Sequence, residues 1–377
     1  MDLIHEAVLR HKDDILKTYA DLHAIPEWGY EEVKTSAYIK EKLEARAIEV
    51  ERVTETGLVA TLTGAAPGLN VGLRADIDAL PFPATGGGTC YIHACGHDGH
   101  TTMGLWTLLL LEELQLVKRG SVRGIFQPAE EKLTGAKAMI KAGAAVGLDE
   151  FYGVHIRPIQ ELKVGQAAPA LWHGGSTMAE VIFKGQTAHG ARPHLGKSAL
   201  DAAALAIMGV NSVWVNPAEQ WSAKATRLHC GGAQANFIPD KAEMSLDIRA
   251  ATNPLMEELL KKVQAACEGA AGMTGCTAEF VVRAAVPAAE YDEETVQRLG
   301  TAIKEVVGEE NYVPPIITPG SDDFHDYKHA DPQLKTAFLA LGAGAAPGLH
   351  APDMHFNIET LVYGTEILVR ALAGRVG

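Results

Sequence analysis

The alternation of apolar and polar positions predicts that helices and strands take turns along the first part of the chain. Apolar residues recur every three to four positions in the helical segments, and short apolar runs bounded by turn residues mark the strands. In chain order the expected elements are helices 1–19 and 31–45, strands 57–62 and 70–76, helix 100–117, strand 122–126, helix 137–144 and strand 150–155. This order indicates an α/β layer in which helices flank a central mixed sheet.

From about Ser176 the pattern changes to that of a smaller α+β domain. In chain order the expected elements are strand 178–185, helix 198–215, strands 223–230 and 242–250, helix 254–271 and strand 277–284. A strand-helix-strand-strand-helix-strand order is the split βαβ arrangement of ferredoxin-like domains. From Glu293 the pattern returns to helix, strand and helix. We therefore expect a discontinuous main domain over 1–176 and 288–377, with a domain inserted over 177–287.

Length, composition and charge narrow the class of protein. A chain of 377 residues, 47% hydrophobic and 21% charged, has room for about two globular domains. Its formal charge of -14 argues against nucleic acid or an anionic membrane surface as a partner. The longest apolar run, Leu105–Leu111, is far shorter than the roughly 18–20 residues that span a bilayer. We expect a soluble globular protein.

The cysteines and the N-terminus indicate the compartment. Five cysteines lie at scattered positions without a CxxC pair, which is not the pattern of a disulfide framework: 90, 95, 230, 267 and 276. The first 19 residues carry charges throughout and do not read as a signal peptide. A reducing compartment fits this usage, so we expect the protein to be cytoplasmic.

The segment His93–His100 holds the densest group of candidate metal ligands, with three histidines, one cysteine and one aspartate. It leads into the apolar helix expected from His100, with Asp98 or Gly99 near the N-cap. Cys95 and His97 can point the same way in an extended segment, and thiolate and neutral imidazole suit zinc and its first-row neighbours. Taken alone, Cys95 also fits a redox or core cysteine.

Three distant segments complete a candidate site. Glu130 and Glu131 follow an apolar strand, His155 ends another, and His350 lies in a glycine-rich loop. Each has an ordinary explanation, because a glutamate pair is often solvated and a single histidine is often structural. Strand ends converge in an α/β fold, however, so the four segments can meet. Together they predict a two-metal site.

The chemistry of such a site gives each group a role. Two divalent ions that share a bridging water lower its pKa towards neutrality. Cys95 can bridge the ions as a thiolate, which a helix N-terminus and metal coordination both favour. Four further residues would complete the ligands: His97, Glu131, His155 and His350. Glu130 beside them can take a proton from the water and return it to a leaving nitrogen.

The sequence does not match several familiar nucleotide-binding and catalytic motifs. Gly190–Ser198 looks like a phosphate loop, but five residues separate its glycines where four are required, and one of the five is a proline. Gly342–Gly348 misses the dinucleotide-binding spacing by one residue. The sequence has neither an HExxH motif nor a GxSxG nucleophile elbow. Neither ATP nor NAD is indicated.

Nine short segments match a known family nearly end to end: 23–27, 74–81, 93–98, 127–131, 153–155, 189–194, 236–240, 320–324 and 349–350. Through them the chain resembles the amidohydrolase branch of the metallopeptidase superfamily that includes aminoacylases, hippurate hydrolases, plant auxin-conjugate hydrolases and carboxypeptidase G-type enzymes. The resemblance implies a zinc-peptidase-like catalytic domain over 1–176 and 288–377 and a lid and dimerisation domain over 177–287. It also implies metal-dependent hydrolysis of N-acyl or N-aroyl amino acids to a carboxylic acid and a free amino acid.

The resemblance also implies roles for individual residues. The expected ligands of two divalent ions per subunit are Cys95, His97, Glu131, His155 and His350, with Glu130 as general acid/base. Zn²⁺ and Mn²⁺ are the first candidates, with Co²⁺ and Ni²⁺ as further ones. Asp78 matches a residue that orients ligands, and Asp98 is expected to cap the helix or to support the ligands. His93 and His100 are expected to pack or to support the site.

The lid supplies the remaining expected residues. His189 matches a histidine that steadies the oxyanion, often in the active site of the partner subunit. Asn236 and Arg249 match positions that help hold the substrate carboxylate, and Gly320 and Ser321 are expected to contact substrate. An exposed edge strand of the lid would support a homodimer or a higher homo-oligomer.

The chain departs from the family pattern at three places. Lys132-Leu-Thr follows the glutamate pair where a small or glycine-rich segment is usual, His355 and Asn357 stand where acidic residues are common, and Tyr91-Ile92 replaces Val-Met. These changes leave the acyl specificity open. A dipeptidase or an aminobenzoyl-glutamate hydrolase with the same site therefore remains an alternative. A catalytically silent metal-binding relative is an alternative from another class.

Overall fold

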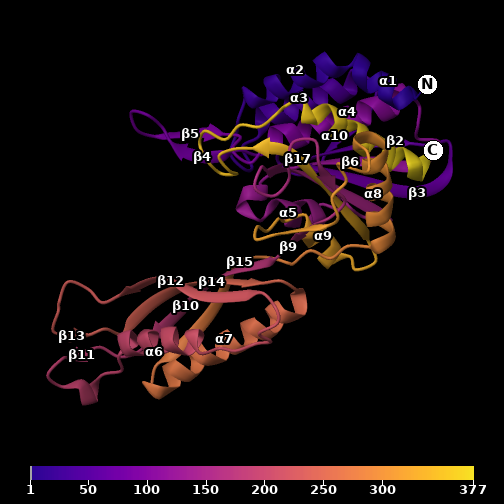
Figure 1. Cartoon of the computed structure of the whole chain (residues 1–377). Helices are drawn as coiled ribbons and strands as arrows, with labels where there is room; N and C mark the ends of the chain where they lie inside the picture. Colours follow the sequence, from indigo (N-terminus) through magenta and orange to yellow (C-terminus); the bar gives the residue numbers. More distant parts are fainter. Residues whose placement is uncertain (1) are drawn as a thin grey trace. The chain divides into compact units, whose positions relative to one another are not determined.

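The computed structural model describes residues 2–377, which form two compact units (Figure 1). Unit 1 takes the chain up to Trp172 together with Glu290–Thr318 and Asp322–Gly377. Unit 2 takes His173–Ala289 together with Pro319–Ser321. These bounds lie a few residues outside the insertion expected at 177–287, and unit 2 gains a second short segment near residue 320.

Unit 1 contains a seven-stranded mixed sheet in the order β1-β2-β6-β3-β7-β17-β8. Its strands are β1 (Glu49–Arg52), β2 (Leu58–Thr63), β3 (Ala66–Asp76), β6 (Arg119–Gln127), β7 (Glu150–Pro158), β8 (Ala167–Ala168) and β17 (Lys335–Ala345). The central strands β6, β3, β7 and β17 pair in parallel, whereas β1, β2 and β8 add antiparallel pairs at the edges. The expected mixed sheet is confirmed, and its parallel part carries the carboxyl ends where a site is expected.

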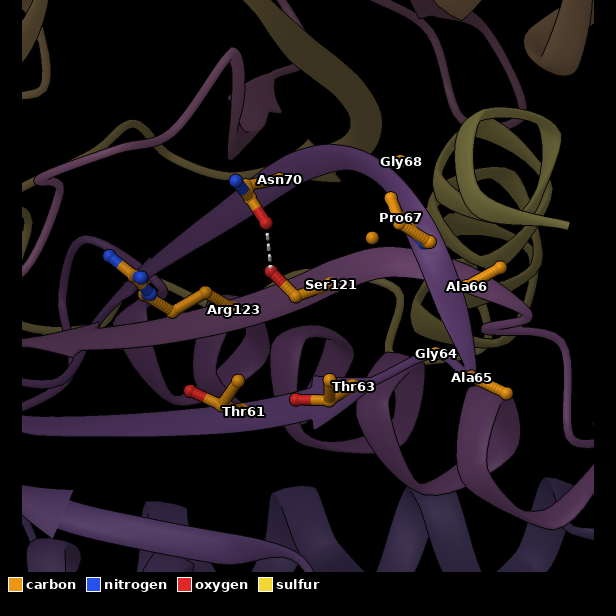
Figure 2. Close-up of a pocket in the computed structure, with 11 residues that line it drawn as sticks. Thr61, Thr63, Gly64, Ala65, Ala66, Pro67, Gly68, Asn70, Ser121 and Arg123 are labelled. Carbon is orange, nitrogen blue, oxygen red and sulfur yellow. Dashed lines mark hydrogen bonds between the residues drawn. The ribbon is translucent and has the colours of Figure 1, made fainter.

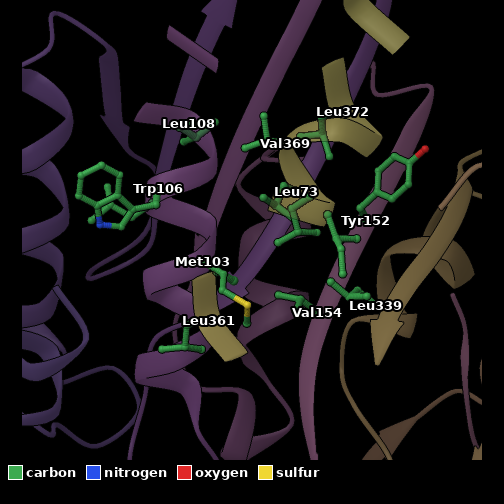
Figure 3. Packing of buried hydrophobic residues seen from close by; sticks show 14 of the residues in the cluster. Leu73, Met103, Trp106, Leu108, Tyr152, Val154, Leu339, Leu361, Val369 and Leu372 are labelled. Atoms are coloured by element: carbon green, nitrogen blue, oxygen red, sulfur yellow. The ribbon is translucent and has the colours of Figure 1, made fainter. Parts of the chain in front are cut away.

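Helices cover both faces of this sheet. They are α1 (Leu3–Arg10), α2 (Lys12–His23), α3 (Val33–Glu44), α4 (His97–Glu113), α5 (Gly135–Lys141), α8 (Glu293–Val307), α9 (His325–Ala330) and α10 (Thr360–Val376). The larger core lies under α4 and α10 and contains Leu73, Met103, Leu108 and Val154 (Figure 3). The core on the other face lies under α5 and α9. Burial on both faces explains why the central strands read as continuous apolar runs.

The start predicted for α4 from the sequence differs from the one in the structure. The helix begins at His97 rather than His100, and its N-cap is Gly96 with φ of 86°. Asp98 and Gly99 lie near this N-cap, in the first helical turn, but neither of them caps the helix. A left-handed φ is open to glycine at little cost, so the chain turns sharply at Gly96 and carries His97 and Asp98 into the first helical turn. The N-terminal helix is also two helices, α1 and α2, that meet at His11.

Unit 2 is a four-stranded antiparallel sheet, in the order β12-β14-β10-β15, with two helices on one face. Its elements are β10 (Gly175–Lys184), α6 (Ala199–Asn211), β12 (Trp221–Cys230), β14 (Lys241–Ala250), α7 (Asn253–Met273) and β15 (Thr277–Val286). This chain order and strand order are those of the expected ferredoxin-like arrangement. Strand β12 lies at an edge of the sheet.

Several short elements escaped the sequence pattern because two to four residues are too few to show a period. They are β4 (Leu80–Pro83), β5 (Thr89–Ile92), β9 (Leu171–His173), β11 (Ala188–His189), β13 (Phe237–Ile238), β16 (Ile316–Thr318) and the 3₁₀ turns η1 (Glu130–Lys132) and η2 (Pro193–Leu195). Among residues 2–377 no helix is long and apolar enough to cross a membrane. All five cysteines are free thiols.

Candidate metal centre

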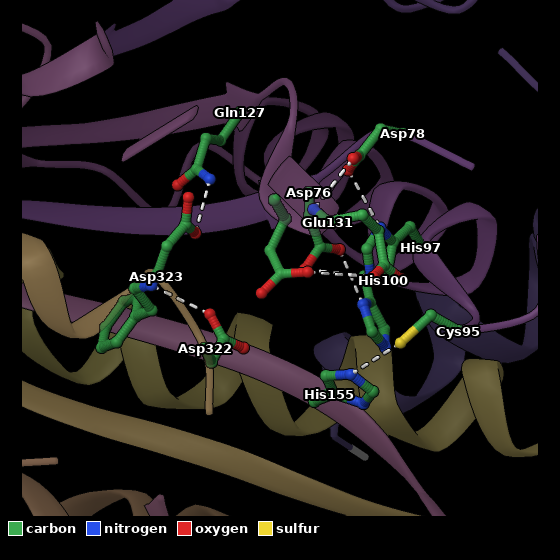
Figure 4. A network of polar contacts seen from close by, with 12 residues as sticks. Asp76, Asp78, Cys95, His97, His100, Gln127, Glu131, His155, Asp322 and Asp323 are labelled. Carbon is green, nitrogen blue, oxygen red and sulfur yellow. Dashed lines mark hydrogen bonds and ion pairs between the residues drawn. The ribbon is translucent and has the colours of Figure 1, made fainter. Parts of the chain in front are cut away.

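Donor atoms from distant segments of unit 1 converge at the carboxyl ends of the central strands (Figure 4). Cys95 precedes α4, His97 opens it, Glu131 lies in η1 after β6, and His155 lies near the end of β7. Cys95 Sγ lies 3.4 Å from His155 Nε2. The donor atoms of Cys95, His97 and His155 all lie within 4.8 Å of one another, and all three residues are buried.

Glu131 joins the fifth expected ligand, His350, to this group. Its Oε1 lies 3.9 Å from His97 Nε2 and 3.4 Å from His350 Nε2. Cys95, Glu131 and His350 also form a cluster whose donor atoms lie within 4.8 Å of one another. The His350 backbone is held by a hydrogen bond from its N–H to the Ala94 carbonyl, at 2.7 Å. The structure therefore brings all five residues expected as ligands into one connected group.

The unsatisfied atoms of this group fit bound cations. His97 Nε2 and Glu131 Oε1 are buried and have no hydrogen-bond partner among the described residues. Unpaired polar atoms in a buried site cost free energy, and lone pairs that face one another call for a cation between them. One thiol, three imidazoles and a carboxylate are a donor set for zinc, manganese and their neighbours. The residues present fit two divalent ions.

Asp78 contacts two of the expected ligands. Its Oδ1 lies 3.1 Å from His97 Nδ1, and its Oδ2 accepts a hydrogen bond from the Glu131 backbone N–H at 3.0 Å. A carboxylate on Nδ1 fixes the histidine ring and leaves Nε2 as the donor to a metal. Asp98 instead lies 2.6 Å from His23 Nδ1, so its side chain ties α2 to the start of α4 rather than orienting a ligand side chain.

Glu130 is buried beside the ligands and close to two further carboxylates. Its Oε2 lies 3.9 Å from His97 Nε2, and it forms a buried cluster with Asp322 and Asp323 in which the oxygens lie within 4.8 Å of one another. Burial and the charge of Asp322 raise the pKa of Glu130 well above its usual value. A raised pKa brings the carboxyl group closer to neutrality, where it can accept a proton in one step and release it in a later one.

Burial shifts three of the expected ligands towards their neutral forms, namely Cys95, Glu131 and His155. For His97 the charge of Asp76 outweighs burial and raises the pKa well above its usual value. Burial raises the pKa of the Cys95 thiol well above its usual value and that of Glu131 to about 7. It lowers the pKa of His155 well below its usual value, with a further contribution from His100. A bound divalent ion reverses this balance for Cys95, because coordination stabilises the thiolate.

A buried network around Arg74 supports the site, and the sequence did not reveal it. The fully buried Arg74 guanidinium contacts Asp76, donates to Asp323 at 2.8 Å and lies 3.2 Å from Asp322. Gln127 donates to the same Asp323 oxygen at 2.7 Å. The signal available in the sequence was an arginine and an aspartate at alternate positions of an apolar strand, where charges are rare unless paired.

The histidines around the ligands divide into two kinds. His100 Nδ1 lies 2.7 Å from Asp76 Oδ1, and its Nε2 accepts from the Ile156 backbone N–H at 2.9 Å, so His100 packs as a satisfied structural residue. Asp76, His97 and His100 nevertheless form a further buried cluster of possible donors. His93 is buried, and neither ring nitrogen has a hydrogen-bond partner among the described residues.

Unit 2 places the expected lid residues in two groups. His189 in β11 lies with its Nε2 3.3 Å from Asn236 Nδ2, while its Nδ1 accepts from the Ala191 backbone N–H. Arg249 in β14 donates to Asp247 at 2.8 Å and to Ser321 at 3.4 Å. Gly320 precedes Ser321 in the segment 319–321 that belongs to this unit.

Two pockets lie elsewhere in the molecule, and their lining residues differ from those of the candidate metal centre. A pocket of about 560 Å³ at β2, β3 and β6 is lined by small and polar residues such as Thr61, Asn70, Ser121 and Arg123, and it contains no histidine, cysteine or carboxylate (Figure 2). A pocket of about 580 Å³ on unit 2 contains Arg227, Arg249 and Arg283, but Glu180 and Asp247 pair with them. Neither pocket provides the groups of a hydrolytic site.

The chain is similar to a known family of peptidases and to known deacetylases. Residues 72–374 match the model of peptidase family M20/M25/M40. The chain is 31% identical to N-acetylcysteine deacetylase of Bacillus subtilis over 371 residues, which cover 92% of each protein. It is 32% identical to N-acetyldiaminopimelate deacetylase of Streptococcus suis over 372 residues, which cover 94% of this chain and 97% of that protein.

Solved structures are similar over the whole chain. A Bacillus subtilis protein described as a dinuclear metal-binding peptidase from the M20 family superposes with a TM-score of 0.81 at 27% identity, covering 97% of this chain and 99% of that one. An aminobenzoyl-glutamate utilization protein from Klebsiella pneumoniae superposes with a TM-score of 0.78 at 21% identity, covering 98% and 97%. The second likeness shows the fold alone.

Proposed function

The chain belongs to peptidase family M20/M25/M40 and is a metal-dependent amidohydrolase, and we propose that its substrates are N-acyl or N-aroyl amino acids. Hydrolysis of their amide bond would release a carboxylic acid and a free amino acid. Family membership confirms the resemblance found in the sequence. The observation that carries the proposal is the convergence of five ligand side chains beside the buried Glu130.

The proposed mechanism assigns each step to a side chain. The ligand group Cys95, His97, Glu131, His155 and His350 would hold two divalent ions. When bound, the ions supply a water molecule of lowered pKa and polarise the amide carbonyl. Glu130 would take a proton from this water and pass it to the leaving nitrogen, which makes the amine a better leaving group.

The residues of unit 2 would stabilise and orient the substrate. His189 would donate to the carbonyl oxygen as negative charge develops there, a contribution worth about 2.7–4 kcal/mol for a well-placed donor. Asn236, Arg249 and Ser321 would hold the substrate carboxylate, because a guanidinium presents two parallel N–H groups to a carboxylate. The hydrogen bond between Arg249 and Ser321 supports this grouping.

We propose Zn²⁺ or Mn²⁺ as the ions, with Co²⁺ and Ni²⁺ as further candidates. The donor set supports this choice, since imidazole, thiolate and carboxylate together tolerate all four ions. We further propose a homodimer or a higher homo-oligomer, supported by the edge strand β12 of unit 2. The five free thiols are consistent with the expected cytoplasmic location.

One experiment tests the function directly. The metal-free protein would be loaded with each of the four ions and assayed on N-acetyl amino acids, hippuryl amino acids, aminobenzoyl-glutamate and a dipeptide. We expect N-acetyl amino acids to be cleaved fastest, because the relatives named above are deacetylases. Fastest cleavage of aminobenzoyl-glutamate or of the dipeptide would favour the alternative substrate. Absence of turnover on the whole panel with every ion would contradict the proposed substrates.

A further inference from the structure

The turn that carries Glu130 and Glu131 has a strained backbone on both sides. Ala129, directly before η1, has φ of 54°, and Leu133, directly after it, has φ of 55°. A left-handed conformation costs a residue with a Cβ about 1–2 kcal/mol, and such strain persists only where the surroundings impose it. The contacts that hold this turn therefore determine where the two glutamates point.

Two buried carboxylates hold the turn from within unit 1. Glu32 accepts from the Ala129 backbone N–H at 2.9 Å and from the Thr56 hydroxyl at 2.6 Å. Asp78 accepts from the Glu131 N–H at 3.0 Å. These bonds fix the start and the middle of the turn, and they leave its far end to other groups.

Lys132 holds the far end of the turn against residues 28–30. Its Nζ donates to the Gly29 carbonyl at 2.6 Å and lies 4.8 Å from the centre of the Trp28 ring and 5.3 Å from that of Tyr30. A cation over two aromatic faces gains roughly 0.5–2 kcal/mol from each. Two aromatic faces and one carbonyl therefore surround the charge of this lysine.

The segment 28–30 packs closely against the turn. A Cβ on Gly29 would lie 2.9 Å from Ala129, so the backbones touch at this point. The Tyr30 hydroxyl donates to Thr134 Oγ1 at 2.8 Å, just beyond the strained Leu133. Lys132 binds the segment 28–30 between these two contacts, at the Gly29 carbonyl.

We propose that Lys132 is a positioning residue for Glu130, fixing the strained turn so that the Glu130 carboxylate stays at the reacting water. The inference rests on the proposed role of Glu130. It gives a function to the lysine that replaces the usual small residue after the glutamate pair. A displacement of about 1 Å at a reacting group costs on the order of 100-fold in rate, so a modest loosening of the turn lowers turnover.

The kinetic test compares three variants. Lys132→Met removes the charge and the donor but keeps a long apolar side chain, Lys132→Arg keeps both, and Lys141→Met on the exposed face of α5 is the matched control. We expect the Met variant to lose about tenfold in kcat with KM within about twofold, while metal content stays near that of the wild type. We expect Lys132→Arg to recover most of this loss. An unchanged kcat in Lys132→Met would overturn the proposal.

A second readout does not depend on activity. Hydrogen exchange of the backbone amides of residues 129–135 should be faster in Lys132→Met than in the wild type and near normal in Lys132→Arg. Equal exchange in all variants would overturn the proposal even if kcat changed. If Lys132→Met does not fold, Lys132→Gln is measured in its place, and normal exchange there would refute a role for the cation. An inactive wild-type protein would refute the proposed function alone, because the exchange measurement still tests whether Lys132 fixes the turn.

Discussion

At the scale of single residues, burial and charge decide which side chains can do chemistry. Glu130, Asp322 and Asp323 are buried with carboxylate oxygens within 4.8 Å of one another, and Arg74 forms ion pairs with the two aspartates. Three carboxylates and one guanidinium cannot all be charged at low cost away from water. Burial accordingly raises the pKa of Glu130 well above its usual value and that of Asp323 to about 7.

Replacing the proposed general base tests this arrangement. Glu130→Gln keeps the size of the side chain but removes the group that accepts a proton, so we expect turnover to fall by about 10²- to 10⁴-fold. Metal content, measured by elemental analysis, should stay near that of the wild type, because Glu130 is not among the proposed ligands. Glu257→Gln, on an exposed face of α7, is the control. Near-normal turnover in Glu130→Gln would exclude the role.

Asp326 at the start of α9 gives a pH-dependent prediction away from the metal ligands. Burial raises its pKa from 3.8 to about 6, even though Lys137 Nζ lies 3.7 Å from its Oδ2. The folded state thus holds this proton more tightly than the unfolded state. The free energy of unfolding therefore falls as pH rises from about 4 to about 6, and the penalty is fully present above that window.

Removal of the Asp326 charge should remove its cost to the free energy of unfolding. We expect Asp326→Asn to raise the free energy of unfolding by about 1–3 kcal/mol at pH 7.5 and to change it little at pH 4. Urea unfolding at both pH values measures this difference, with the exposed Asp13→Asn as control. Equal effects of Asp326→Asn at the two pH values would show that the buried charge is not the cause.

At the scale of elements, α4 links the core to the site. Every residue from His97 to Leu111 is buried, so the helix is enclosed on all sides, and its first turn presents His97 and Asp98. The periodicity of apolar residues predicted a helix here but not its first turn. Gly96 supplies the start through a left-handed φ, a feature that a search for polar N-caps does not find.

A substitution in the middle of α4 tests its contribution to the core. Leu108 is fully buried, and its Cδ1 occupies the space left by the absent side chain of Gly124 on β6. We expect Leu108→Ala to lower the free energy of unfolding of unit 1 by about 2–5 kcal/mol, measured by urea unfolding. Leu9→Ala, at a leucine that is 53% exposed on α1, should cost far less. Equal costs for the two leucines would contradict the packing described here.

At the scale of the whole molecule, the net charge is divided unequally between the two units. Unit 2 contains ten basic and ten acidic side chains, so the whole formal charge of -14 lies in unit 1. A negative field around the candidate metal centre favours the approach of divalent cations. The anionic substrate must then be met by local donors, which is the role proposed for Arg249.

The proposed action of His189 across a dimer can be tested by complementation. His189→Ala and Glu130→Gln should each be inactive as homodimers. In mixed dimers one of the two sites would combine an intact Glu130 with an intact His189 from the partner. A statistical mixture should then recover about a quarter of wild-type activity, provided light scattering shows a dimer. No recovery from mixed dimers would place the action of His189 within its own subunit.

The sequence by itself determined the class of fold, the split into a main and an inserted segment, and the residues expected as ligands. These features depend on local periodicity and on the chemistry of side chains, which a linear pattern carries. The tertiary structure decided which groups share a buried space: Arg74 with three aspartates, Asp78 between two ligands, and Lys132 between two aromatic rings. Such contacts join residues far apart in the chain, and only the packing of the folded core sets their distances and their desolvation.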